Sequence, residues 1–151
     1  MPDDEKYMRL ALDEAEKAAA EGEVPTGCVI VDAEGNIVAC EHNRTEKSCD
    51  ASAHAEMLAL KSAFRRHGNW RLQEHTLYVT KEPCPMCAGA IVLSRIARVV
   101  WGVGDPKRGG GSVFGIFDHP GINHHPETTD NVLEWQCKEI LQEFFRKRRQ
   151  K

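Results

Sequence analysis

The order of segments between residues 76 and 103 constrains the fold of this chain more than any other feature of the sequence. Residues 76–80 are typical of a buried strand, residues 85–93 predict a helix, and residues 99–103 predict a second strand. Pro85 fits this interpretation because proline is tolerated in a first helical turn. Strands that are joined through a helix in this order pair in parallel, so the sequence predicts an α/β fold.

The segments on either side complete this α/β pattern. Apolar residues recur at helical spacing over residues 3–21, and two short apolar runs at 28–31 and 37–40 predict an antiparallel hairpin. A helix that Asp50 or Ser52 caps is expected to run to His67-Gly68, where glycine supplies the stop. A last helix is predicted over residues 131–149, with these apolar positions on one side: Leu133, Cys137, Ile140, Leu141, Phe144 and Phe145.

Composition limits the class of protein. A chain of 151 residues with 41% hydrophobic content and no repeat or linker is expected to form a single domain over residues 1–151. Its acidic start is unlike a secretory leader, and its apolar runs are too short to span a bilayer, so we expect a cytoplasmic protein without a membrane segment. The last six residues hold five cations, which suit either a solvated helix end or a nucleic-acid contact.

Two short motifs lie where two of the predicted helices begin. The first is His54-Ala55-Glu56, and the second is Pro83-Cys84-Pro85-Met86-Cys87. Cysteines three residues apart in a first helical turn can bind one cation as thiolates, which the positive end of the helix dipole favours. His54 adds a nitrogen donor, so the motifs together predict a metal site.

The number of ligands favours a catalytic zinc ion over a structural one. A closed structural site needs four protein ligands, whereas a catalytic site keeps one position for water. Cys28, Cys40, Cys49 and Cys137 occur singly, so we expect one zinc per chain with three ligands, and Cys49 is the alternative fourth. Zinc can lower the pKa of bound water from about 15.7 to about 7.

Glu56 is the candidate general acid and base because it lies two residues beyond His54. A carboxylate there can take a proton from water and pass it to the ring nitrogen of an amino-bearing base, which then loses ammonia. No organic cofactor is needed.

Each motif alone has an ordinary interpretation, since a CxxC pair can be a redox dithiol and a zinc site can merely stabilise an RNA-binding module. The combination of H-x-E with P-C-x-x-C is the signature of zinc deaminases.

With these motifs, the chain resembles the TadA-type bacterial tRNA adenosine deaminases over nearly its whole length. The following segments carry the resemblance: Glu23-Val24-Pro25, Asn43-Arg44, Ala53-His54-Ala55-Glu56-Met57, Leu77-Tyr78-Val79-Thr80, Glu82-Pro83-Cys84, Ala88-Gly89-Ala90, Ser94-Arg95-Ile96, His119-Pro120-Gly121, Asn123-His124 and Phe144-Phe145-Arg146.

The resemblance implies a three-layer α/β/α cytidine-deaminase-like fold with a mixed sheet of about five strands, and a homodimer. It implies conversion of the wobble adenosine of a tRNA anticodon stem-loop to inosine, with zinc on His54, Cys84 and Cys87 and with Glu56 as the proton shuttle. Asn43 would bind the flipped base. Further residues would lie near the RNA, namely Asp105, Lys107, Phe144, Phe145 and Arg148. From the sequence alone, Asn43 could equally cap a turn, and the two phenylalanines could be core residues.

The chain departs from the family pattern at two places. Asp50-Ala51-Ser52 stands where Asp-Pro-Thr is common, and His125-Pro126 follows Asn123-His124 where an arginine is usual. The second departure removes a cation that could contact phosphate. The alternative function is a deaminase of a free nucleobase such as guanine or cytosine, which would not need the basic terminus.

Overall fold

The computed structural model describes residues 3–150, which form helices and strands in alternation. In chain order the elements are α1 (Asp4–Ala20), β1 (Gly27–Val31), β2 (Ile37–His42), α2 (Ala55–His67), β3 (Thr76–Lys81), α3 (Pro85–Leu93), β4 (Arg98–Val103), the 3₁₀ helix η1 (Ile116–Asp118), β5 (Glu127–Thr129) and α4 (Glu134–Arg149).

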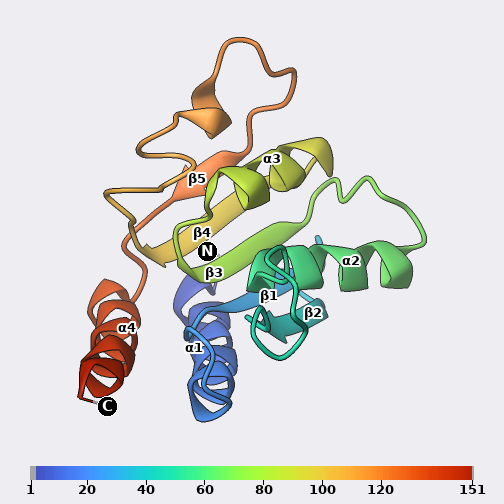
Figure 1. Ribbon diagram of the computed structural model, residues 1–151. Helices are drawn as coiled ribbons and strands as arrows, with labels where there is room; N and C mark the ends of the chain where they lie inside the picture. Colours follow the sequence, from blue (N-terminus) through green and yellow to red (C-terminus); the bar gives the residue numbers. More distant parts are fainter. Residues whose placement is uncertain (1–2, 151) are drawn as a thin grey trace.

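The five strands form one mixed sheet in the order β2-β1-β3-β4-β5 (Figure 1). β1 is antiparallel to both β2 and β3, while β4 is parallel to β3 and to β5. In the parallel pair, Thr76 lies opposite Arg98 and Lys81 lies opposite Val103. The helix-linked crossover that was predicted between residues 76 and 103 is therefore confirmed, and so is the α/β class.

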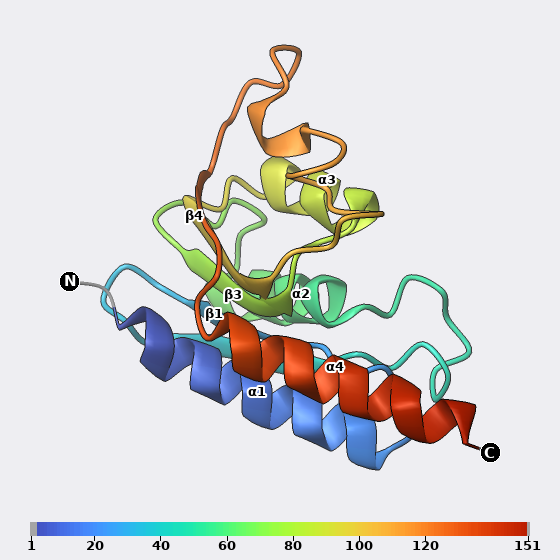
Figure 2. The same ribbon diagram turned by 90° about the vertical axis from the view of Figure 1, so that its left-hand side faces the viewer.

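Alternate residues of the sheet build two separate cores. Cys28 and Ile30 on β1 face a cluster that includes α2 and α3, whereas Val29 and Val31 face a cluster with α1 and Cys137 of α4. This division follows from the two-residue period of a strand, which sends successive side chains to opposite faces. Figure 2 shows α1 and α4 side by side on one face of the sheet, with α2 and α3 on the other. The expected three layers are confirmed.

The start of α2 differs from its predicted cap. Neither Asp50 nor Ser52 caps the helix, because the Asp50 carboxylate accepts the Ser52 N–H at 2.9 Å and the Ser52 hydroxyl at 2.7 Å. These two bonds close a separate turn before the helix. His54 occupies the N-cap position with extended backbone angles, and Gly68 ends the helix in the left-handed region, as the sequence predicts.

The last helix begins three residues later than predicted. Asn131 and Leu133 have φ angles of 61° and 53°, which are incompatible with a right-handed helix, so α4 starts at Glu134. Cys137 is the only apolar residue of α4 that is fully buried. It packs against Gly102 of β4, and a side chain at position 102 would overlap the Cys137 thiol.

The three-residue strand β5 was not predicted. No helix within residues 3–150 combines the length and apolar character needed to cross a membrane.

Candidate active site

Three side chains that are placed to hold one metal ion meet at the carboxyl ends of β3 and β4. His54 comes from the residue before α2, Cys84 from the residue before α3, and Cys87 from the first turn of α3. The His54 Nδ1 atom lies 3.6 Å from each cysteine sulfur, and the three donor atoms all lie within 4.8 Å of one another. Within residues 3–150 this is the only group of its kind, and Cys49 lies outside it.

These separations suit tetrahedral zinc. Zn–N and Zn–S bonds of about 2.1 and about 2.3 Å at a tetrahedral angle require donors roughly 3.6 Å apart. Both distances from the His54 nitrogen to the sulfurs meet this requirement. A set of one imidazole and two thiolates also matches the ligand preference of zinc, and it leaves a fourth position free for water.

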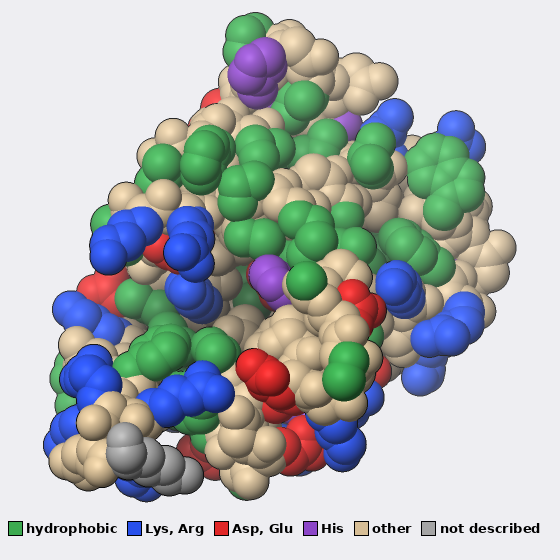
Figure 3. All heavy atoms as spheres, viewed as in Figure 1, with side chains coloured by type: hydrophobic (Ala, Val, Ile, Leu, Met, Phe, Trp, Pro, Cys, Tyr) green, Lys and Arg blue, Asp and Glu red, His purple; other side chains and the backbone are tan. Residues whose placement is uncertain are grey.

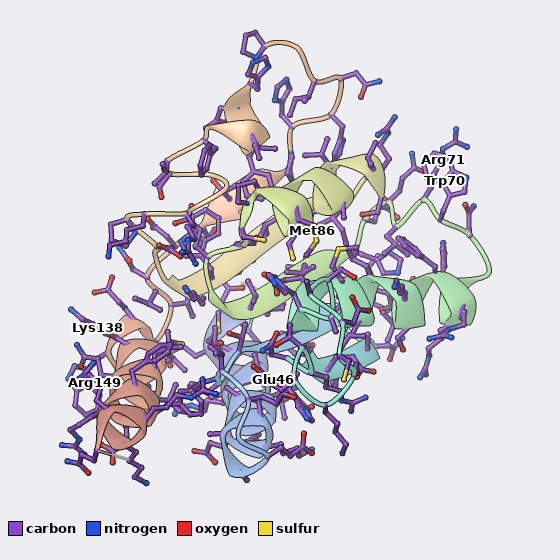
Figure 4. All side chains as sticks on the ribbon, viewed as in Figure 1. Glu46, Trp70, Arg71, Met86, Lys138 and Arg149 are labelled. Carbon is purple, nitrogen blue, oxygen red and sulfur yellow. The ribbon has the colours of Figure 1, made fainter. Side chains whose placement is uncertain are left out.

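The two thiols are unequal in their readiness to ionise. A hydrogen bond with Cys87 lowers the pKa of Cys84 to about 4, and the same bond raises the pKa of Cys87. Both residues also lie at the positive end of the α3 dipole. The shared hydrogen bond therefore favours ionisation of Cys84 over Cys87. Met86 lies between the two cysteines in the sequence, on the accessible side of α3, with 38% of its surface exposed (Figure 4).

Glu56 is buried beside the three donors. It lies in the first turn of α2, is 3% exposed, and lines a cavity of about 410 Å³ together with His54 and Cys84. Burial raises the pKa of the Glu56 carboxyl to about 7. A carboxyl group with a pKa near neutrality can both accept and return a proton, as a general acid and base must do.

The cavity brings together some of the residues that the resemblance selected. Asn43, Asp105 and Phe145 line it with the metal-binding residues, whereas Lys107 and Arg148 are not among its lining residues. Asn43 is only 7% exposed, and its backbone N–H donates to the Thr26 carbonyl at 3.1 Å. This bond fixes the backbone of Asn43 at the cavity wall, where the residue is buried.

The two phenylalanines of α4 are not core residues. Phe145 reaches the cavity and keeps 39% of its surface exposed, while Phe144 is half-buried. The guanidinium of Arg148 lies over the Phe144 ring, 5.1 Å from its centroid, in a cation–π contact. Figure 4 shows Lys138 and Arg149 on the side of α4 that points away from the sheet. Lys151 lies outside the described residues.

Sequence reasoning missed three charged residues of the cavity wall, namely Lys81, Glu82 and Arg108. Lys81 ends β3, and its ammonium group lies 3.3 Å from Asp105. The two-residue period of β3 was an available signal, because it puts Lys81 on the same face of the sheet as Leu77 and Val79, which belong to the cluster with α2 and α3. Figure 3 shows Lys and Arg side chains gathered over α4 and over the loop after β4, beside the hollow of this face.

This arrangement defines the class of protein. A redox dithiol does not require a histidine 3.6 Å from both sulfurs or a buried carboxyl group next to them. An α/β sheet that holds one nitrogen donor, two sulfur donors and a buried acid at a concave site is the construction of a zinc-dependent hydrolytic deaminase.

Comparison with known proteins agrees with this class. Residues 1–103 match the model of the cytidine and deoxycytidylate deaminase zinc-binding region, and the chain belongs to this family. It is 48% identical over 152 residues to a tRNA-specific adenosine deaminase of Bacillus subtilis, with 100% of this chain and 94% of the relative covered. A relative of the same name from Haemophilus influenzae is 49% identical over 148 residues, covering 97% of this chain and 86% of its own length.

A solved structure from studies of A-to-I editing by tRNA:A34 deaminases at the wobble position of transfer RNA superposes with a TM-score of 0.87. It is 41% identical and covers 90% of this chain and 99% of its own. The resemblance that the sequence motifs indicated is therefore confirmed at the level of both sequence and fold.

Proposed function

We infer that this chain catalyses the hydrolytic deamination of adenosine to inosine at the wobble position of a tRNA anticodon. The observation that carries this function is the convergence of His54, Cys84 and Cys87 beside buried Glu56. The choice of substrate is supported by 48% identity to a tRNA-specific adenosine deaminase over the full length of the chain.

We propose that His54, Cys84 and Cys87 hold one zinc ion, which when bound supplies an activated water at neutral pH. Glu56 accepts one proton from water and delivers it to N1 of the adenine ring as the water oxygen adds to C6. Glu56 then accepts the remaining proton of the new C6 hydroxyl and passes it to the amino group, which leaves as ammonia while C6 keeps the oxygen. Burial of Glu56 supports this role because it keeps the pKa near 7, where both transfers are possible.

We also propose how the remaining residues bind RNA. Asn43 would hydrogen-bond the flipped base, since its amide is buried at the cavity wall. Phe145 would stack on a neighbouring base, because its ring is exposed at the same cavity. Asp105, Lys107, Phe144 and Arg148 would contact the adjoining nucleotides from the rim; the cations gathered there support an RNA contact.

One experiment tests the substrate directly. The zinc-loaded protein is incubated with an anticodon stem-loop that carries adenosine at the wobble position, and in parallel with free adenine, guanine and cytosine. We expect inosine from the stem-loop at a much higher initial rate than any product from the free bases. Guanine turnover without inosine would assign the alternative, a free-base deaminase.

Deletion of residues 146–151 provides the second discrimination. If RNA is the substrate, stem-loop deamination falls sharply, because these residues hold five cations that can contact phosphates. If a free base is the substrate, its turnover is largely unchanged. Measuring zinc content of the truncated protein controls for damage to the metal site.

We further propose a homodimer of single-domain chains that acts in the cytoplasm, where its tRNA substrate would be found. Exposed apolar side chains on α3 and on the loop after β4 support self-association, namely Met86, Leu93, Val113 and Phe114. Both buried clusters share one sheet, which supports a single domain over residues 1–151. Sedimentation of the 16.9 kDa chain distinguishes a dimer from a monomer.

A further inference from the structure

Glu82 is a buried carboxylate that the chemistry at the metal site does not use. It follows β3, precedes Pro83-Cys84 and is 3% exposed. Its Oε1 atom accepts the Asp105 N–H at 3.0 Å and the Ser112 hydroxyl at 2.7 Å. Its Oε2 atom accepts the Gly111 N–H at 3.1 Å and the Ser112 N–H at 2.6 Å. All four donors belong to residues 104–112, which we call the glycine loop.

The glycine loop lies directly on the metal motif. The Gly110 N–H donates to the Pro83 carbonyl at 2.7 Å. A Cβ atom at Gly110 would lie 2.9 Å from the Pro83 carbonyl oxygen and 3.0 Å from that of Cys84, which is closer than side chains normally approach backbone. A Cβ atom at Gly109 would overlap the Glu82 carboxylate itself. Glycine is therefore required for the loop to reach Glu82.

The same loop supplies charged groups to the cavity. Asp105 and Arg108 both line it. The Asp105 carboxylate accepts the N–H groups of Lys107 and Arg108 at 3.0 Å each, and it pairs with Lys81 at 3.3 Å. Since the Asp105 N–H is one of the four donors to Glu82, the position of these charges depends on the bonds that Glu82 accepts.

We propose that Glu82 is a positioning residue that holds the glycine loop against the metal motif, so that the loop can bind the phosphodiester backbone beside the target adenosine. This inference rests on the proposed function, because it assumes an RNA substrate. Glu82 itself contacts no reacting atom, since both of its oxygens are occupied by loop donors. It acts on capture of the substrate, while Glu56 acts on the chemical step.

The test compares steady-state kinetics of the zinc-loaded wild type and Glu82→Gln on the wobble-adenosine stem-loop. Glutamine has nearly the same size as glutamate, but its NH₂ group replaces one of the two acceptor oxygens. That NH₂ group would face N–H and O–H donors of the glycine loop and could not accept their hydrogen bonds. We expect KM to rise roughly 10-fold or more, because a charged hydrogen-bond network is lost, while kcat changes less than about 3-fold. Zinc content should stay at one ion per chain.

Asp4→Asn is the matched control. Asp4 is also a carboxylate with several hydrogen-bond donors, from Arg98 and Tyr78, but it lies at the opposite ends of β3 and β4. This variant should lower the melting temperature without changing KM. A loss of stability alone therefore cannot imitate the expected result for Glu82→Gln.

The possible outcomes distinguish a failure of the proposed function from a failure of the role proposed for Glu82. No inosine from wild-type protein would overturn the proposed function, whereas normal wild-type activity with an unchanged KM in Glu82→Gln would overturn only the positioning role. A fall in kcat at unchanged KM would also overturn it. If Glu82→Gln loses zinc or unfolds, Ser112→Ala decides, because it removes one hydroxyl donor only: a KM rise of about 3-fold supports the role, and an unchanged KM refutes it.

Discussion

The two ends of the parallel pair β3 and β4 use the same kind of interaction for different purposes. At the carboxyl ends, Glu82 accepts four hydrogen bonds from the glycine loop beside the cavity. At the amino ends, Asp4 accepts two bonds from Arg98, at 2.7 Å each, and one from the Tyr78 hydroxyl at 2.9 Å. Arg98 also donates to Thr129 of β5, at 2.9 Å.

The difference follows from the topology of parallel strands. Crossover connections leave such strands at their carboxyl ends, so loops and helix N-termini gather there and ligand sites form there. At that end a buried carboxylate holds segments that also face the cavity. At the other end the same chemistry joins α1 to β4 and β5, where no residue of the cavity is involved. The elements that a carboxylate holds therefore decide whether it serves function or stability.

The largest effect should come from removing a metal ligand at the carboxyl end. We expect Cys84→Ser to lose bound zinc and all measurable deamination, because the group has only three donors and a serine hydroxyl is a much weaker zinc ligand than a thiolate. Added zinc should raise the melting temperature of the wild type, since binding to the folded state stabilises it, but not that of the variant. Zinc analysis of purified protein and thermal unfolding measure both effects. Full zinc occupancy in Cys84→Ser would remove this residue from the ligand set.

Glu56→Gln should separate catalysis from binding at the same end of the sheet. The amide is similar in size but cannot carry the proton, so we expect kcat to fall on the order of 10²–10⁴-fold. Zinc content and stem-loop affinity should stay at wild-type values, as isothermal titration of the variant would measure. Ammonia release at the wild-type rate would exclude Glu56 as the shuttle.

At the amino end, Asp4→Asn should affect stability alone, by about 1–3 kcal/mol at neutral pH, with kcat and KM unchanged. The hydrogen bonds from Arg98 lower the pKa of Asp4 below 3.8. A lowered pKa means that the stabilisation is present above the unfolded-state pKa and is lost as the pH falls through the folded-state pKa. Urea unfolding between pH 7 and pH 3 should show the difference between wild type and variant shrinking as the pH falls. A constant difference would contradict the ionised pair.

The smallest effect is expected from single cations of α4. Arg148→Gln should weaken stem-loop binding. The slope of the logarithm of the binding constant against the logarithm of the salt concentration should become shallower by about 0.7–0.9. The free energy of unfolding should stay within about 0.5 kcal/mol of the wild-type value. Arg66→Gln is the matched control, because Arg66 is an exposed cation in the last turn of α2. Equal salt slopes for wild type and Arg148→Gln would place Arg148 outside the RNA contact.

The sequence predicted the elements and the metal donors because both depend on neighbours a few residues apart. The CxxC spacing puts two sulfurs in one helical turn, and the H-x-E spacing puts the acid two residues from the imidazole. The cap of α2 was predicted wrongly because Asp50 and Ser52 bond to each other instead of to the helix. The start of α4 was also missed, since the left-handed angle of Leu133 has no signal in its residue type.

The sequence by itself determined which chemistry this protein performs, since the residue types and spacings of its two motifs admit few other uses. Only the tertiary structure decided which charges face the cavity. Glu82 and Ser112 are 30 residues apart, and their contact exists because the β3–α3–β4 crossover returns the chain to the metal motif. Such contacts arise from the packing of whole elements on a shared sheet, and local sequence patterns carry no information about distances of that kind.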